Sequence, residues 1–206
     1  LPRELCREVQ MFGLVNRAVE RFVIDNYGEE AWSRIAQMGK LGVDSFEPML
    51  KYDDAITDRL ITASSLFLGK SEEILFEDLG NYLVSHPNCE VPRRLLRFGG
   101  ETFADFLLSL DDLPERARLA VPDLEIPMIE VDETEASSYG YVVRVRGVIE
   151  GLEFFLSGVL RAMADDYGTL ALLEIEEADT LGRHLRVAIH DTDFGEGRKF
   201  ELAKRG

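Results

Sequence analysis

The stretch FADFLLSLDDLPERARLAVPDLEIP, residues 103–127, sets the organisation of this 206-residue chain. Apolar residues at helical spacing run up to Leu113, and Pro114 follows directly. Because proline lacks an amide proton and has a fixed φ, it fits the first turn of a helix but not the interior. The spacing therefore predicts one helix over residues 102–113 and a second helix that starts with Pro114 in its first turn.

The residues before this stretch are predicted to form helices. Apolar side chains recur at helical spacing over residues 12–38, and Asn26-Tyr27-Gly28 interrupts them, which predicts two helices joined by a turn. Asp53 or Asp54 can cap a further helix, because a carboxylate accepts hydrogen bonds from the unpaired amides of the first turn. The first part of the chain is therefore expected to be helical.

The later residues have the pattern of a sheet. Residues 141–149 alternate as in a strand, with valines on one face and Arg144 and Arg146 on the other. A helix over residues 151–167 and two further strands over residues 171–178 and 184–190 complete the pattern.

Together these patterns predict an α+β fold in one domain over residues 11–201. A helical amino-terminal lobe, residues 11–100, is expected to pack on a second lobe, residues 101–201, that contains an antiparallel sheet and helices. Residues 1–10 are interpreted as an upstream extension, because Met11 can be a natural start.

The charge of the chain argues against two classes of partner. With 39 acidic and 23 basic residues the formal net charge is −16, which repels nucleic acid and anionic membranes. The opening LPRELCREVQ lacks the apolar segment of a secretory signal, and no segment is apolar for long enough to span a bilayer. We therefore expect a cytoplasmic protein that binds neither nucleic acid nor membrane.

The sequence lacks the parts of an active site. The three histidines, His86, His184 and His190, are too far apart for a metal-binding pair, and no Cys-x-x-Cys occurs. Acidic pairs such as Asp165-Asp166 are interpreted as solvated surface, because a chain this acidic has such pairs by chance. Gly99-Gly100 lacks the Lys-Ser/Thr of a phosphate loop and predicts a turn between helices. The chain is expected not to be an enzyme.

The order of several motifs resembles the heme nitric oxide/oxygen-binding (H-NOX) family, and is most similar to the heme domain of the soluble guanylate cyclase β subunit. The motifs are Asn26-Tyr27-Gly28 followed by Trp32, the triplet Tyr52-Asp53-Asp54, the step Leu110-Asp111, and the helix from Gly151 through Gly158. The resemblance covers residues 11–201 and implies a sensor of nitric oxide or oxygen.

The resemblance also implies a heme between two lobes, with iron bound by a histidine in the family pattern Leu-Asp-x-Leu-His. Here the pattern reads Leu110-Asp111-Asp112-Leu113-Pro114, and proline has no side-chain donor for iron. Pro127 corresponds to the proline that presses on the heme in the family. The family's Tyr-x-Ser-x-Arg run, which holds the heme propionates, falls on Val145, Gly147 and Ile149; after a slip of register, Arg144 or Arg146 could replace its arginine.

The helix that lines the opposite face of the heme in the family corresponds here to the helix with Leu83 and His86. The imidazole of His86 could bind iron from that side. Alternatively, His86 ends this helix before Pro87 and favours its dipole. The second interpretation is preferred, because a lone histidine more often has a structural role.

Three hypotheses follow. In the first, the domain keeps heme, with an unusual ligand such as His86 or with none from the protein, and senses a diatomic gas. In the second, it keeps the sensor fold, and another apolar ligand or side chains that fill the cavity replace histidine-bound heme. In the third, it is a scaffold for a protein partner. The second is favoured, because Val145, Gly147 and Ile149 give an apolar wall. The resemblance implies a signalling partner such as a histidine kinase or a cyclic-dinucleotide enzyme, and the sequence leaves the oligomeric state open.

Overall fold

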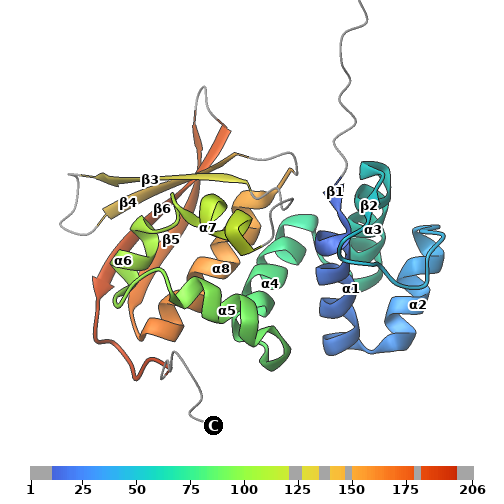
Figure 1. The fold of residues 1–206 in the computed structure, drawn as a ribbon, viewed down its shortest axis with the longest axis horizontal. Helices are drawn as coiled ribbons and strands as arrows, with labels where there is room; N and C mark the ends of the chain where they lie inside the picture. The colour runs from blue at the N-terminus through green and yellow to red at the C-terminus, as the bar shows by residue number, and fades with distance from the viewer. Residues whose placement is uncertain (1–10, 121–126, 135–139, 147–149, 179–181, 199–206) are drawn as a thin grey trace, which may run out of the picture. The chain divides into compact units, whose positions relative to one another are not determined.

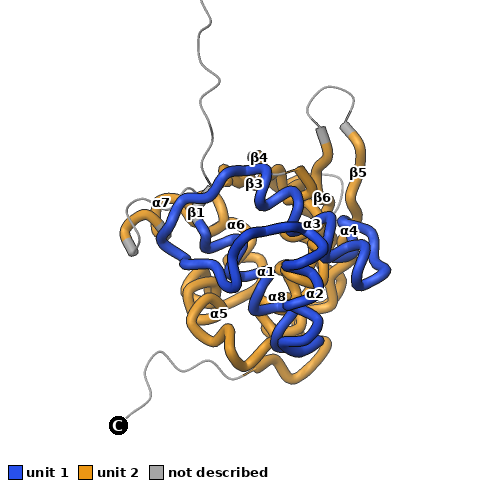
Figure 2. Tube along the Cα trace, turned by 90° about the vertical axis from the view of Figure 1, so that its right-hand side faces the viewer, with its two compact units in different colours: residues 1–75 blue, residues 76–206 orange. Residues whose placement is uncertain are grey.

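The computed structural model describes residues 11–120, 127–134, 140–146, 150–178 and 182–198. The chain divides into two compact units, Leu1–Leu75 and Phe76–Gly206, which Figure 2 shows in different colours. The first unit contains helices α1 (Gly13–Tyr27), α2 (Glu29–Met38) and α3 (Asp54–Leu68), with the short antiparallel pair β1 (Met11–Phe12) and β2 (Lys51–Tyr52). Helix α4 (Glu72–Ser85) starts in the first unit and continues into the second.

In the first unit, the turn between α1 and α2 and the start of α3 lie where the sequence predicts. Gly28, at φ 86°, separates α1 from α2 in a conformation that is easy only for glycine. Asp53 caps α3 and accepts a hydrogen bond from the amide of Ala55 at 2.9 Å. The core between the helices is apolar and includes Val19, Val23, Ile35 and Leu60.

One buried acid holds a loop on α1. Glu20 is almost fully buried and accepts hydrogen bonds from the amide of Phe46 at 2.8 Å and the hydroxyl of Ser45 at 3.1 Å. It also pairs with Arg17. A buried carboxylate is stable only with such partners, so these contacts fix the segment at Ser45–Phe46.

The second unit contains a four-stranded antiparallel sheet with helices (Figure 1). The strands β3 (Met128–Thr134), β4 (Gly140–Arg146), β5 (Leu170–Ala178) and β6 (Gly182–Asp191) lie in the order β3-β4-β6-β5. The helical elements are the later part of α4, the 3₁₀ turn η1 (Pro87–Cys89), α5 (Glu90–Arg97), α6 (Phe103–Leu108), α7 (Leu113–Ala120) and α8 (Leu152–Tyr167). The predicted α+β class and antiparallel sheet are confirmed.

Helix α8 packs on one face of the sheet and against α4. Its buried residues, including Leu156, Leu160 and Met163, join the apolar core formed with the inward residues of the strands. Between α8 and α4 the contact is made by glycines: a Cβ on Gly80 would lie 2.0 Å from the carbonyl oxygen of Phe155, and one on Gly158 2.0 Å from that of Glu77. This close approach places α4 from Phe76 onward with the sheet, so the units divide at Leu75/Phe76 and not near residue 100.

The predicted single helix over residues 102–113 is wrong. Helix α6 ends at Leu108, and α7 begins at Leu113 after a turn. The break has a local cause: the Ser109 hydroxyl donates to the carbonyl of Phe106 at 2.7 Å, and the Asp111 carboxylate accepts from the amide of Val131 at 2.7 Å. These polar contacts compete with helical hydrogen bonding.

Among the described residues, no helix combines the length and apolarity needed to cross a bilayer.

Candidate functional site

Pro114 lies in the first turn of α7, as predicted, and is buried. The turn before it is fixed on both sides: Arg116 donates from Nη2 to the carbonyl of Ser109 at 2.8 Å, and Asp111 accepts from β3. Leu113 packs against the core of the second unit. Pro114 therefore occupies a well-determined position with a side chain that offers no donor atom.

The side chains of β4 alternate between two faces of the sheet, as predicted. Val143 is fully buried, and Val145 is partly buried and packs against the same core. On the opposite face, Arg144 pairs with Asp132 of β3, and Arg146 with Glu130 at 3.2 Å. Both arginines therefore already have carboxylate partners within the sheet. The predicted site residues Gly147 and Ile149 lie outside the described residues.

Pro127 is partly buried and lies directly before β3. Two residues further on, Ile129 pairs with Val145 in the antiparallel register, and α7 lies in contact with β3. Leu83 of α4 packs against the same core cluster as Val145 and Leu113. The predicted site residues Leu83 and Val145 therefore pack against one apolar core, which Leu113, the neighbour of Pro114 in α7, also contacts.

His86 follows α4 and caps η1. Its Nδ1 accepts from the amide of Asn88 at 3.2 Å, and its ring lies on Tyr82 with the ring centroids 4.8 Å apart. The amide of Cys89, a buried free cysteine, donates to the His86 carbonyl at 2.9 Å. Over the described part of the chain, no group of three or more His, Cys, Asp or Glu is placed to hold a metal ion.

Sequence reasoning missed an ion cluster around Asp166. The carboxylate is 1% exposed and lies 2.7 Å from Nη2 of Arg93 and 3.5 Å from Nε of Arg97. Arg198 approaches it to 4.0 Å, and the Arg198 amide donates to the Asp166 carbonyl at 2.9 Å. The expectation that Asp165-Asp166 is solvated surface is therefore wrong for Asp166. Arg93 and Arg97, four residues apart, share a helix face, and that spacing was the available signal.

Tyr167 extends this cluster. The Arg97 guanidinium lies 3.6 Å over the Tyr167 ring, and the Tyr167 hydroxyl donates to the carbonyl of Gly100 at 2.9 Å. Burial raises the pKa of the Tyr167 hydroxyl, and the positive charge of Arg97 opposes that change. The phenol therefore remains a neutral hydrogen-bond donor at neutral pH.

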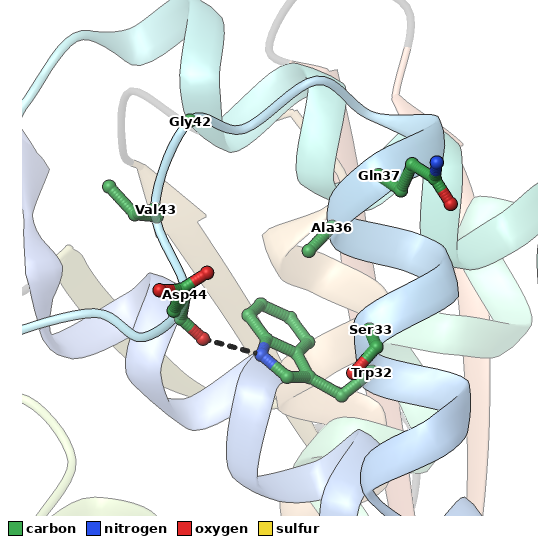
Figure 3. Close-up of a pocket in the computed structure, with 7 residues that line it drawn as sticks. All are labelled: Trp32, Ser33, Ala36, Gln37, Gly42, Val43 and Asp44. Atoms are coloured by element: carbon green, nitrogen blue, oxygen red, sulfur yellow. Dashed lines mark hydrogen bonds between the residues drawn. The ribbon is translucent and has the colours of Figure 1, made fainter.

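A pocket of about 460 Å³ lies within the first unit, between α2 and the loop that follows it (Figure 3). It is lined by Trp32, Ser33, Ala36 and Gln37 of the helix and by Gly42, Val43 and Asp44 of the loop. The Trp32 indole donates to the Asp44 carbonyl at 2.8 Å, which fixes the ring against the loop. The lining contains no histidine, cysteine or basic residue, so it offers neither a nitrogen ligand for iron nor a cation for a propionate.

A model of the haem-NO-binding family matches residues 12–175 of this chain. The chain belongs to this family. The assignment confirms the predicted H-NOX resemblance. Domains of the H-NOX family are heme-based sensors of nitric oxide or oxygen, occur in guanylate cyclases, and sense rather than catalyse.

Among curated proteins, this H-NOX chain is 24% identical over 184 residues to soluble guanylate cyclase gcy-31 of Caenorhabditis elegans, covering 87% of this chain and 26% of that protein. It is 24% identical over 157 residues to soluble guanylate cyclase 89Db of Drosophila melanogaster, covering 76% of this chain and 23% of the relative. The chain thus spans about a quarter of the length of these cyclases.

Solved H-NOX structures share the fold. An H-NOX protein from S. oneidensis in the Fe(II)NO ligation state superposes with a TM-score of 0.72 at 12% identity, over 88% of this chain and 100% of that one. The Fe(II) unliganded H-NOX protein from K. algicida gives a TM-score of 0.70 at 15% identity, over 88% and 97% of the two chains. At these identities the likeness establishes the fold alone.

Proposed function

We propose that this domain is an H-NOX signalling domain that has lost histidine-ligated heme, carries out no catalysis, and holds another apolar ligand in place of heme. The observation that carries this proposal is Pro114, which stands where the family has its iron ligand and is buried in the first turn of α7. The described residues at the family's ligand and propionate positions do not fit histidine-bound heme.

The environment of β4 supports the proposal. Val145, at the first position of the propionate-binding run, packs against an apolar core. An ionised carboxylate placed beside an apolar wall without a hydrogen-bond donor loses more hydration free energy than a neutral amide or hydroxyl, for which the cost is already roughly 2–7 kcal/mol. Arg144 and Arg146 are paired with Asp132 and Glu130, so they would have to leave these partners to serve a propionate.

The alternative of a heme held by His86 has weaker support. The described contacts of His86 are those of a residue that ends one helix and caps the next turn, with Nδ1 used as an acceptor. Ligation of iron would therefore have to preserve this cap or replace it.

We further propose that the domain acts on a signalling enzyme such as a histidine kinase, a cyclic-dinucleotide enzyme or a guanylate cyclase. A ligand can shift the equilibrium between two conformations only by its difference in affinity for them, and a partner then reads the change. Cyclase relatives that carry a similar segment in about a quarter of their length favour this kind of output.

The first experiment measures the visible spectrum and the heme-to-protein ratio of protein made in cells supplied with heme precursor. The proposal predicts a folded protein without a stoichiometric Soret band that does not retain added hemin. Native mass spectrometry of the same sample should detect the apolar ligand. A stoichiometric Soret band that shifts under nitric oxide and disappears in His86→Ala would instead establish a heme sensor ligated by His86.

Pro114→His tests the ligand position directly. If Pro114 is the sole obstacle to heme, this variant gains a Soret band on hemin addition, because an imidazole then stands at the family's ligand position. If it still fails to retain heme, the apolar wall at the propionate positions or a filled cavity is the better explanation. Leu119→His is the matched control, since Leu119 lies on the same helix and is strongly exposed. Equal heme binding by the two variants would show that the position of Pro114 is not special.

A further inference from the structure

The segment that follows β6, residues 192–198, lies against the carboxyl end of α8, and we call it the strap. The Gly195 amide donates to the Gly168 carbonyl at 3.0 Å, and the Arg198 amide donates to the Asp166 carbonyl at 2.9 Å. Both acceptors lie at the end of the helix, where the carbonyls have no partner within the helix itself. The backbone of the strap therefore docks on the helix end.

The docked strap fits the helix end closely. A Cβ on Gly197 would lie 2.7 Å from the carbonyl carbon of Tyr167 and 2.8 Å from its oxygen. A Cβ on Gly168 would lie 2.3 Å from the carbonyl oxygen of Gly195. Only glycine allows two backbones to approach so closely. The strap therefore has one defined docked position and does not simply lie near the helix.

Burial of apolar surface contributes little to this docking. Within residues 192–198, Gly197 is partly buried and the other residues are exposed. The one large apolar side chain of the strap, that of Phe194, is 65% exposed. A segment with few buried apolar contacts opens at a lower free energy than the strands and helices that form the core. Polar contacts therefore hold the strap in place.

The side-chain contacts of the strap with the helices are long. The Arg198 guanidinium lies 4.0 Å from the Asp166 carboxylate and donates to the Ser85 carbonyl at 3.4 Å, and the Arg198 side chain is 55% exposed. Arg93 and Arg97 also pair with Asp166, at 2.7 and 3.5 Å. The carboxylate keeps these two counter-ions when Arg198 leaves, so detachment of the strap does not leave a buried charge unpaired.

We propose that the strap is a latch, which docks on the carboxyl end of α8 in one state and detaches as a unit in another, while α8 and the sheet stay folded. Ordering and release of a segment is a recurrent way in which signalling proteins change state. A ligand or partner that contacts the strap, or the helix end under it, in only one state would shift this equilibrium. The latch does not depend on whether the domain holds heme.

Amide hydrogen exchange of the purified chain, followed by NMR, tests the latch, because the Gly195 and Arg198 amides are bonded to α8 only in the docked state. We expect both amides to exchange more slowly than an unbonded amide, but at least roughly a hundredfold faster than the slowest amides of the sheet. Both should show the same opening constant, since the strap detaches as a unit. Low concentrations of urea should leave their exchange unchanged, because local opening exposes little surface.

A pair of glycine variants tests the docked position. Gly197→Ala should speed exchange of the Arg198 amide by about tenfold or more, because the new Cβ would meet the backbone of Tyr167. The sheet amides and the Tm should stay unchanged. Gly195→Ala is the matched control: it makes the same substitution two residues earlier in the strap, where nothing lies within 4 Å of the Cβ position, and should leave the Arg198 amide unchanged.

A pair of arginine variants tests the ionic contact. Arg198→Ala should speed exchange of the Gly195 amide by about two- to fivefold, as expected for loss of a partly exposed ion pair. It should also remove the acceleration that added salt causes in the wild-type chain, since salt screens this pair. Arg186→Ala is the matched control, because the Arg186 side chain is also 55% exposed but pairs with Glu176 within the sheet.

Three results would overturn the proposal. If the Gly195 and Arg198 amides exchange only as slowly as the sheet, the strap is an integral part of the fold. If they exchange at the rate of unbonded amides in the wild-type chain, the strap has no docked state. If Gly197→Ala speeds exchange in the sheet by the same factor as in the strap, the strap and the core open together and there is no latch.

Discussion

At the scale of the residue, two buried acids determine local structure that the composition conceals. Glu20 fixes a loop on α1, and Asp166 pairs with Arg93 and Arg97 of α5. In a sequence with 39 acidic residues, nothing local separates these two from the solvated majority. They are recognised only when the fold brings amides or guanidinium groups from distant segments to them.

Asp166→Ala should destabilise the protein by about 3 kcal/mol, because it leaves buried arginines without their counter-ion. Asp165→Ala is the matched control, since this neighbour in sequence is exposed and its replacement should change stability by less than about 0.5 kcal/mol. Urea denaturation of both variants measures the difference. Equal stabilities would mean that the cluster contributes little.

Part of the candidate site could be predicted from individual residues of the sequence. The sequence predicted Pro114 in the first turn of a helix because proline has few options there, and the structure agrees. It could not show that Arg144 and Arg146 are paired across the sheet, because the register with Asp132 and Glu130 depends on how β3 and β4 align.

At the scale of the element, glycines decide how closely helices approach. Gly80→Ala should destabilise the protein by about 2 kcal/mol or more, because the new Cβ would lie 2.0 Å from a backbone oxygen of α8, which cannot move alone. Gly195→Ala is the control, since nothing lies within 4 Å of its Cβ position. Thermal unfolding compares the two, and an unchanged Tm for Gly80→Ala would show that the helices separate easily.

The capping box at the start of α6 makes the stability of the protein depend on pH. Thr102 and Asp105 form a capping box, and hydrogen bonds from the Thr102 hydroxyl and amide hold the pKa of the Asp105 carboxyl below its ordinary value. The pKa of the Asp105 carboxyl is therefore lower in the folded chain than in the unfolded chain. Its contribution to the free energy of unfolding is fully present above the unfolded pKa of about 4 and is lost as pH falls through the folded pKa.

Asp105→Asn should therefore lower stability at pH 7 and make less difference at pH 3, when measured by urea denaturation. Asp58→Asn, at an exposed residue in the interior of α3, serves as the control for the substitution itself. If Asp105→Asn destabilises the protein equally at both pH values, the charge of the carboxylate has no part in the cap.

At the scale of the whole molecule, the sequence predicts the class of fold better than it predicts the boundary between the two compact units. Hydrophobic periodicity predicted most helices and three of the four strands of the large sheet, β4, β5 and β6, because burial of one face imposes that period. It failed over residues 102–113, where side-chain hydrogen bonds from Ser109 and to Asp111 end the helix early. It also placed the division near residue 100, because periodicity does not show that Gly80 and Gly158 join α4 to α8.

The attachment of Arg198 joins the strap to two helices. Its backbone amide donates to the Asp166 carbonyl and its guanidinium approaches the Asp166 carboxylate, while the nearby Gly195 amide donates to the Gly168 carbonyl. Nη1 of Arg198 also donates to the carbonyl of Ser85, the last residue of α4, at 3.4 Å. The strap therefore links the carboxyl ends of α8 and α4, and its removal would take away one of the three arginines that surround Asp166 among the described residues.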